Sequence, residues 1–296
     1  MKIFDTFMYF NEDLILDIRL NELNEFIDKF VIVESNFTHS GEKKKLNFDI
    51  KKFSKFSDKI IYVVSNDKPK NYMEVNNDDS ANEKQRKKVI NAINLDNHQR
   101  NKISEGLVDA SKNDLILVSD IDEIPNFQSF NLEKISSKII VFNQYFFHYK
   151  LNLYLKSLNF YGTKACLKKN FKSPQWLRNI KGKKYNKFRI DILFSNKKYN
   201  NIHFIDDGGW HFTNIMTEEQ LIYKLKSYAH HAEFPKDNLN KEFLKNLINE
   251  RKMIYDHTAD KSADKYSKKI NLDVFNLEYL PNYIKNNKEK FSEWLI

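Results

Sequence analysis

Three acidic side chains lie close together directly after an apolar run, in the segment LILVSDIDEIP (115–125), at Asp120, Asp122 and Glu123. Three negative groups within four positions repel one another unless a positive charge neutralises them. Along a strand, alternate side chains share a face, so we expect Asp120 and Asp122 on one side and Glu123 on the other. Two carboxylates on one face suit a hard divalent cation, Mg²⁺ or Mn²⁺, that binds phosphate oxygens. Solvated carboxylates in a capped turn are the simpler alternative for an isolated D-x-D pattern.

Two earlier apolar runs also end in polar residues. FVIVES (30–35) ends at Glu34 and Ser35 and is followed by Asn36, and KIIYVVSND (59–67) ends in the same manner. Helix-like segments separate the apolar runs, which indicates an α/β protein with a mostly parallel sheet covered on both faces. Ligands of open α/β sheets bind beyond the carboxyl ends of the strands. We therefore predict that the polar clusters converge on one cleft.

The second half of the chain has a different pattern. KIIVFNQYFFHYKLNLYL (138–155) predicts one or two longer aromatic strands, with antiparallel pairing as an option. Helical spacing of apolar residues recurs in 217–231 and in 240–255. We expect a catalytic domain over 1–235 and a C-terminal helical extension, 236–296, packed on the same domain.

The net charge of +9 allows an anionic partner, but the lysines look scattered and form no nucleic-acid-binding motif. We therefore expect a solvated basic surface and no nucleic acid, with a membrane or anionic partner as the alternative. The single cysteine, Cys166, excludes an internal disulfide and suits a reducing compartment. The absence of a secretory signal or a long apolar run favours a soluble cytoplasmic protein. The tail 277–296 mixes aromatic residues with lysine, so it either packs on the domain or contacts a membrane peripherally.

Three blocks resemble glycosyltransferase family 17, whose animal members add the bisecting GlcNAc to glycoproteins. The first block, 5–48, contains ESNFT followed by Gly and Lys. The second is LILVSDIDEIP (115–125) with Arg100 upstream. The third is HFIDDGGWHFT (203–213) followed by LIYKLKSYAHHAEFP (221–235).

The resemblance implies a GT-A-like fold and inverting, metal-dependent transfer of a sugar, with UDP-GlcNAc as the expected donor and Mn²⁺ or Mg²⁺ as cofactor. The positions that match family motifs are Glu34, Ser35, Asn36, Arg100 and Asp120 for donor binding, and Asp120, Asp122 and His211 for the metal or phosphate. Trp210 either packs or stacks on a sugar of the donor. The animal enzymes have a membrane anchor and this chain starts at its first strand, so we expect a microbial or viral enzyme. Its expected acceptor is a glycan or a lipid-linked glycan, and the bisecting reaction itself is not carried over.

Inverting transfer also needs a general base near the acceptor hydroxyl. Glu123 lies beside the metal motif, although strand alternation turns it away from Asp122. Asp207 precedes the Gly-Gly-Trp turn, where backbone can approach a sugar closely. Both carboxylates stay candidates, with a slight preference for Glu123. The rival functions are a metal-dependent nucleotidyltransferase or phosphohydrolase, and a non-catalytic module that binds carbohydrate or nucleic acid.

Overall fold

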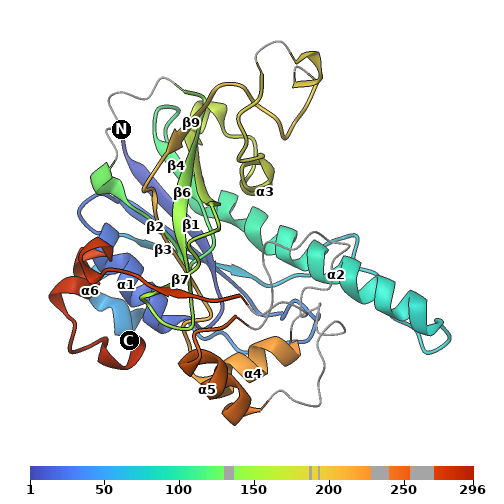
Figure 1. The fold of residues 1–296 in the computed structure, drawn as a ribbon. Coiled ribbons are helices and arrows are strands. Elements are labelled where there is room, and N and C mark those ends of the chain that lie inside the picture. Colours follow the sequence, from blue (N-terminus) through green and yellow to red (C-terminus); the bar gives the residue numbers. More distant parts are fainter. Residues whose placement is uncertain (130–136, 187–188, 193, 228–239, 254–269) are drawn as a thin grey trace.

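The computed structural model describes residues 1–129, 137–186, 189–192, 194–227, 240–253 and 270–296. A large sheet of eleven strands forms the centre, with helices around it (Figure 1). The strands are β1 (Ile3–Tyr9), β2 (Lys29–Ser35), β3 (Ile60–Ser65), β4 (Leu115–Val118), β5 (Glu123–Pro125), β6 (Ile139–His148), β7 (Leu153–Tyr154), β8 (Phe160–Leu167), β9 (Ile202–Ile205), β10 (Gly209–Thr213) and β11 (Asp273–Val274). The α-helices are α1 (Asp13–Leu23), α2 (Ala81–Asn101), α3 (Pro174–Asn179), α4 (Glu218–Ser227), α5 (Lys241–Asn249) and α6 (Asn282–Asn286). Short 3₁₀ helices are η1 (Ile50–Phe56), η2 (Lys102–Leu107), η3 (Phe127–Ser129), η5 (Lys168–Asn170), η6 (Ile190–Ile192), η9 (Leu277–Tyr279) and η10 (Ser292–Trp294).

The N-terminal half of the sheet is parallel, in the order β4-β1-β2-β3. Its strands are apolar along most of their length, as expected for strands that are buried on both faces. On β2, Ile32 packs in one core with Leu16 of α1, whereas its neighbour Val33 packs in a second core with Ile103 of η2. The α/β class and the two-sided covering predicted from the sequence are confirmed.

The C-terminal half of the sheet is mixed. β8 joins the two halves, because it pairs antiparallel with both β4 and β6. β6 also pairs in parallel with β9 and β10, and β10 pairs antiparallel with the short strand β5. The aromatic segment of the sequence therefore forms β6 and β7, and these two strands pair antiparallel. The acidic segment after β4 is attached to this half, because β5 at its end pairs with β10.

The C-terminal tail packs on the first helix of the chain. Leu280, Ile284 and Phe291 are buried, and the amide of Tyr283 donates a hydrogen bond of 2.8 Å to the Glu22 carboxylate of α1. The boundary expected at 235/236 lies outside the described residues, and the helix expected over 240–255 ends at Asn249. Among the described residues, no helix is long and apolar enough to cross a membrane.

Candidate active site

A cleft of about 1020 Å³ lies beyond the carboxyl ends of the parallel strands. Its walls come from the residues after β1, the loop 37–44, one face of α2, residues 120–122, and the segment from β10 into α4. α2 and α4 lie on the same side of the molecule in Figure 1. The cleft occupies the edge at which an open α/β sheet binds its ligands.

The acidic segment is a turn between two strands. β4 ends at Val118 and β5 begins at Glu123, and the Glu123 amide donates to the Asp120 carbonyl at 3.0 Å. Strand alternation therefore does not apply here, but Asp120 and Asp122 still both line the cleft and Glu123 does not, as expected from the sequence. Asp120 and Glu123, the first and last residues of the turn, are the two acids that share a partner.

Two arginines hold the Asp120 carboxylate. Arg100 Nη2 lies 3.0 Å from Asp120 Oδ1, and Arg178 Nη2 lies 2.7 Å from Oδ2. Burial works against ionisation of this carboxyl, but the charges of Arg178 and Arg100 overcome it, so the pKa of Asp120 lies well below its usual range. Both oxygens are therefore engaged with guanidinium groups.

Glu123 is fully buried and forms a bidentate pair with Arg178. The two N–O distances are 2.5 and 2.7 Å, and the Asp120 amide donates to the same carboxylate at 3.1 Å. Burial raises the pKa of Glu123, and the charge of Arg178 opposes that shift. Because Glu123 does not line the cleft, its carboxylate has no path to an acceptor hydroxyl there. This position disfavours the general-base role expected from the sequence.

A further arginine, Arg19, fixes the backbone of the turn. Arg19 of α1 is inaccessible to solvent, and its Nη1 donates to the carbonyls of Asp120, Ile121 and Glu123 at 3.2, 3.0 and 2.8 Å. Its charge is neutralised by Asp5 of β1 at 2.5 Å. Three carbonyls bound by one guanidinium leave the turn little conformational freedom.

Sequence reasoning missed both Arg19 and Arg178. Arg19 had a signal, because it interrupts the apolar stripe of α1 in LILDIRLNEL, where a charge is buried only with a partner. Arg178 had none, because it lies in a long basic segment in which many cations look alike. Its position on α3 becomes meaningful only when α3 packs against β8 and α2.

Asp122 is oriented differently from its two acidic neighbours. Its Oδ2 lies 3.4 Å from His211 Nε2 of β10, and both side chains line the cleft. Their exposed fractions, 20% and 10%, leave each of them an accessible surface. Burial opposes ionisation of Asp122, but the His211 charge and hydrogen bond outweigh it and lower the pKa of this carboxyl. The His211 ring is fixed by stacking on Phe160, with the ring centroids 4.1 Å apart.

Asp122 and His211 fit a divalent cation. Two neighbouring ligands of an octahedral ion, each about 2.1 Å from it, are separated by roughly 3 Å, close to the observed 3.4 Å. Asp120 does not fit as a third ligand in this structure, because arginines engage both of its oxygens. No group of three or more metal-ligating side chains occurs within the described part of the chain. A cation here would complete its coordination with water and phosphate oxygens, as Mg²⁺ commonly does.

Glu34, Ser35 and Asn36, here called the ESN block, form hydrogen bonds that position the loop 37–44 of the cleft wall. The Glu34 carboxylate is buried outside the cleft and accepts four hydrogen bonds, from Lys44 Nζ (2.5 Å), Asn47 N (2.7 Å), Phe48 N (3.0 Å) and Tyr62 Oη (2.9 Å). Ser35 Oγ accepts from the Phe37 amide at 3.0 Å, and Asn36 Nδ2 donates to Asn66 at 3.3 Å. These bonds shape the loop 37–44, which does line the cleft. None of the three ESN residues lines it.

Trp210 and Asp207 lie at a different depression, of about 350 Å³. Trp210 is largely buried and its Nε1 donates to the Tyr279 carbonyl at 2.8 Å, and Asp207 is bonded to Tyr145 Oη. Adjacent side chains on a strand point to opposite faces, so Trp210 turns away from the cleft that His211 enters. The structure thus brings Asp120, Asp122, His211 and Arg100 together at the cleft, and Trp210 and Asp207 outside it.

The family model described as glycosyltransferase family 17 matches residues 1–296, the whole chain. The protein is therefore a glycosyltransferase. It belongs to glycosyltransferase family 17.

No curated protein matches the sequence. Among solved structures, the chain is similar to the 2-C-methyl-D-erythritol 4-phosphate cytidylyltransferase (IspD) of Francisella tularensis, with 11% sequence identity and a TM-score of 0.28. That match covers 77% of this chain and 100% of the other.

Proposed function

We propose that this glycosyltransferase moves a sugar from a nucleotide sugar, with UDP-GlcNAc as the expected donor, to a hydroxyl of a glycan acceptor with inversion. We further propose that it depends on a divalent cation held by Asp122 and His211. The observation that carries this proposal is the 3.4 Å pair of Asp122 and His211 on the cleft wall, beside an acid that two arginines neutralise. A bound cation would neutralise the charge that develops on the leaving diphosphate.

The donor diphosphate is assigned to the wall that carries Arg100. This arginine lines the cleft next to Asp120, and Lys88 lines it farther towards the N-terminus of α2. Lys44 reaches the cleft from the loop that Glu34 fixes. Positive groups at fixed positions stabilise a diphosphate without reorganisation at the moment of transfer.

We propose that the general base is a carboxylate that lines the cleft, and not Glu123 or Asp207. Glu12 and Asp13 lie there, directly after β1. Asp13 is held by Tyr9 Oη and Lys52 Nζ, each at 2.5 Å, and Glu12 Oε2 accepts from two backbone amides. An acceptor hydroxyl must reach one of them within hydrogen-bonding distance.

For the compartment and the acceptor class, our proposal keeps the expectation from the sequence. Cys166 is buried and burial raises the pKa of its thiol to about 12, so it is neither a disulfide partner nor a nucleophile in this fold. We propose a cytoplasmic enzyme that modifies a glycan or a lipid-linked glycan.

The test is nucleotide release from a panel of UDP-, GDP- and CMP-sugars, with Mn²⁺ or with chelator. We expect release from one donor, UDP-GlcNAc first, which chelator abolishes and which Asp122→Asn lacks. Asp191→Asn is the matched control, because Asp191 is an exposed aspartate outside the cleft. Equal release in chelator, or full activity of Asp122→Asn, would contradict the proposal.

A further inference from the structure

The positive charge of the chain is concentrated in one segment. Residues 168–198 contain eleven lysine or arginine residues and a single acidic residue, Asp191. The whole chain has a net charge of +9, so the rest of the sequence is close to neutral. The excess of positive charge is therefore local, although lysines occur along the whole sequence.

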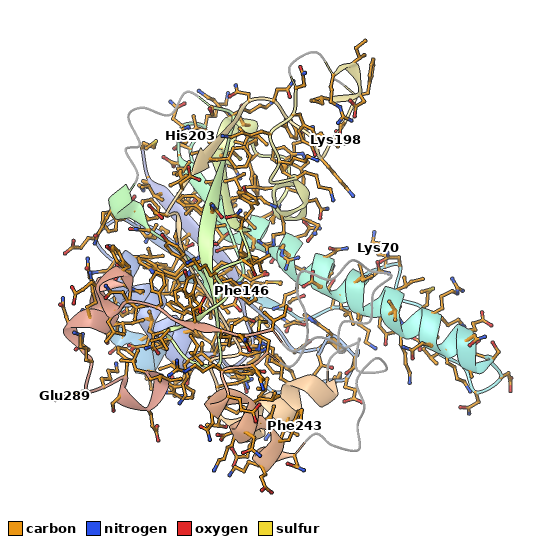
Figure 2. The ribbon with its side chains drawn as sticks, viewed as in Figure 1. Lys70, Phe146, Lys198, His203, Phe243 and Glu289 are labelled. Carbon is orange, nitrogen blue, oxygen red and sulfur yellow. The ribbon has the colours of Figure 1, made fainter. Side chains whose placement is uncertain are left out.

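This segment forms one end of the molecule. In Figure 1 it follows β8, includes α3, and extends beyond the sheet at the end opposite to α4 and α5. Figure 2 shows Lys198 and His203 at this end and Phe243 of α5 at the other. We call the described part of residues 168–204 the basic end. None of its described residues lines the cleft, although Arg178 of α3 pairs with Asp120 there.

Lysines of the basic end and its flank lie on aromatic rings. The ammonium-to-centroid distances are 5.5 Å for Lys172 on Trp176, 5.6 Å for Lys184 on Phe204, and 5.8 Å for Lys138 on Tyr199. Trp176 and Tyr199 are half-buried and bonded to each other, Nε1 to Oη, at 3.1 Å. Tryptophan, tyrosine and lysine are the side chains that combine an apolar body with a polar tip, and they gather at lipid–water interfaces.

Two large apolar side chains are exposed at the tip of the basic end. Ile190 is 71% exposed and Phe194 is 85% exposed, whereas Ile192 between them is buried. The turn is held by Asp191, which pairs with Arg189 and Lys198 at 2.8 Å each. An exposed apolar tip in a segment rich in lysine and arginine presents to water the groups that an anionic bilayer would accommodate.

We propose that the basic end docks on an anionic membrane surface, with Phe194 and Ile190 entering the interface and the surrounding lysines facing lipid phosphates. Charge complementarity carries this choice of partner, because a negative leaflet attracts clustered lysine and arginine. The exposed apolar tip favours lipid over nucleic acid, whose backbone offers no apolar layer for it. The proposal depends neither on the donor nor on the metal. It also replaces the tail 277–296 as the membrane contact, since that tail is packed on α1.

The charge part is tested by sedimentation of the full chain with phosphatidylcholine vesicles, with and without phosphatidylglycerol. We expect binding only to the anionic vesicles, weakened by salt. Lys183→Gln with Lys197→Gln removes two exposed cations and should weaken binding about 25-fold, at roughly fivefold for each charge. Lys70→Gln with Lys288→Gln, which removes two exposed lysines elsewhere, should change it by less than about threefold. Equal loss in both pairs would overturn the assignment to the basic end.

The apolar part is tested with Phe194→Ser and Ile190→Ser, each expected to weaken vesicle binding by about tenfold or more. Ile93→Ser is the control, because Ile93 of α2 is 54% exposed and lies outside the basic end. Thermal melts confirm that each variant is folded. Absence of binding to anionic vesicles overturns the proposal, and so does binding of single-stranded RNA that persists in Phe194→Ser. Wild-type binding by Phe194→Ser and Ile190→Ser would also overturn it.

Discussion

Asp120 and Asp122 are two positions apart, yet their carboxylates have opposite surroundings. On one side of the turn, Asp120 and Glu123 are neutralised by Arg100 and Arg178. On the other side, Asp122 pairs with the ring of His211 and lines the cleft. We call the first the arginine side and the second the cleft side.

The contrast shows how one short motif serves two purposes. The arginine side uses charge to hold the turn, because the buried Glu123 carboxylate would be costly to leave unpaired. The cleft side keeps a carboxylate and an imidazole available for a ligand. A D-x-D pattern therefore identifies the segment that carries the site, whereas the partners decide which of its acids is available.

The largest effect is expected on the arginine side. Arg178→Ala leaves Glu123 and Asp120 without their shared guanidinium and should lower the free energy of unfolding by about 3–5 kcal/mol. Chemical denaturation measures it. The control Arg189→Ala removes an exposed arginine and should cost less than about 1 kcal/mol. Equal costs for the two variants would show that the arginine side is not structural.

The cleft side should respond in activity and not in stability. Asp122→Asn is expected to lower kcat on the order of 100-fold or more, because the cleft loses the carboxylate assigned to the cation. Its unfolding midpoint should stay near that of the wild type, since the substitution leaves no buried arginine without its carboxylate partner. A large loss of stability with activity retained would reverse the roles of the two sides.

The sequence predicts the features that depend on neighbouring residues, and it does not predict contacts between residues far apart in the chain. The buried strands were readable, because continuous apolar runs such as β2 and β4 leave few alternatives. The acidic turn was located correctly, and Asp120 and Asp122 do share the cleft, although β4 ends at Val118 and a turn, not strand alternation, places them there. The partner Arg178 comes from α3, 55 residues from Glu123, and only tertiary packing brings them together.

The pH dependence of stability gives a further test of the arginine side. Lys164 of β8 is buried there, and its Nζ donates to the Arg178 carbonyl at 2.5 Å. Burial lowers the pKa of Lys164 to about 7. Between about pH 7 and pH 10 the unfolded chain binds a proton that the folded chain lacks, so stability rises with pH, by up to about 1.4 kcal/mol per pH unit.

Lys164→Met should remove this slope, which denaturation at several pH values measures. Below about pH 7 both states bind the proton, and the wild type and the variant should show parallel dependence. A wild-type slope that survives in Lys164→Met would assign the effect to another group.

The smallest effect is expected outside both sides, at Trp210. Trp210→Phe removes the hydrogen bond to the Tyr279 carbonyl and should cost about 1 kcal/mol of stability. Because Trp210 does not line the cleft, the KM for the donor should stay within about threefold of wild type. A larger rise in KM with unchanged stability would restore the donor-stacking role expected from the sequence.

The central claim is that the cleft side, and not the arginine side, holds the cation. Mn²⁺ titration in the presence of UDP, followed by electron paramagnetic resonance, compares Asp122→Asn with Asp120→Asn. Our account predicts that Asp122→Asn weakens Mn²⁺ binding by more than about 100-fold, whereas Asp120→Asn stays within about tenfold of wild type. Loss of Mn²⁺ binding in Asp120→Asn with retention in Asp122→Asn would contradict it.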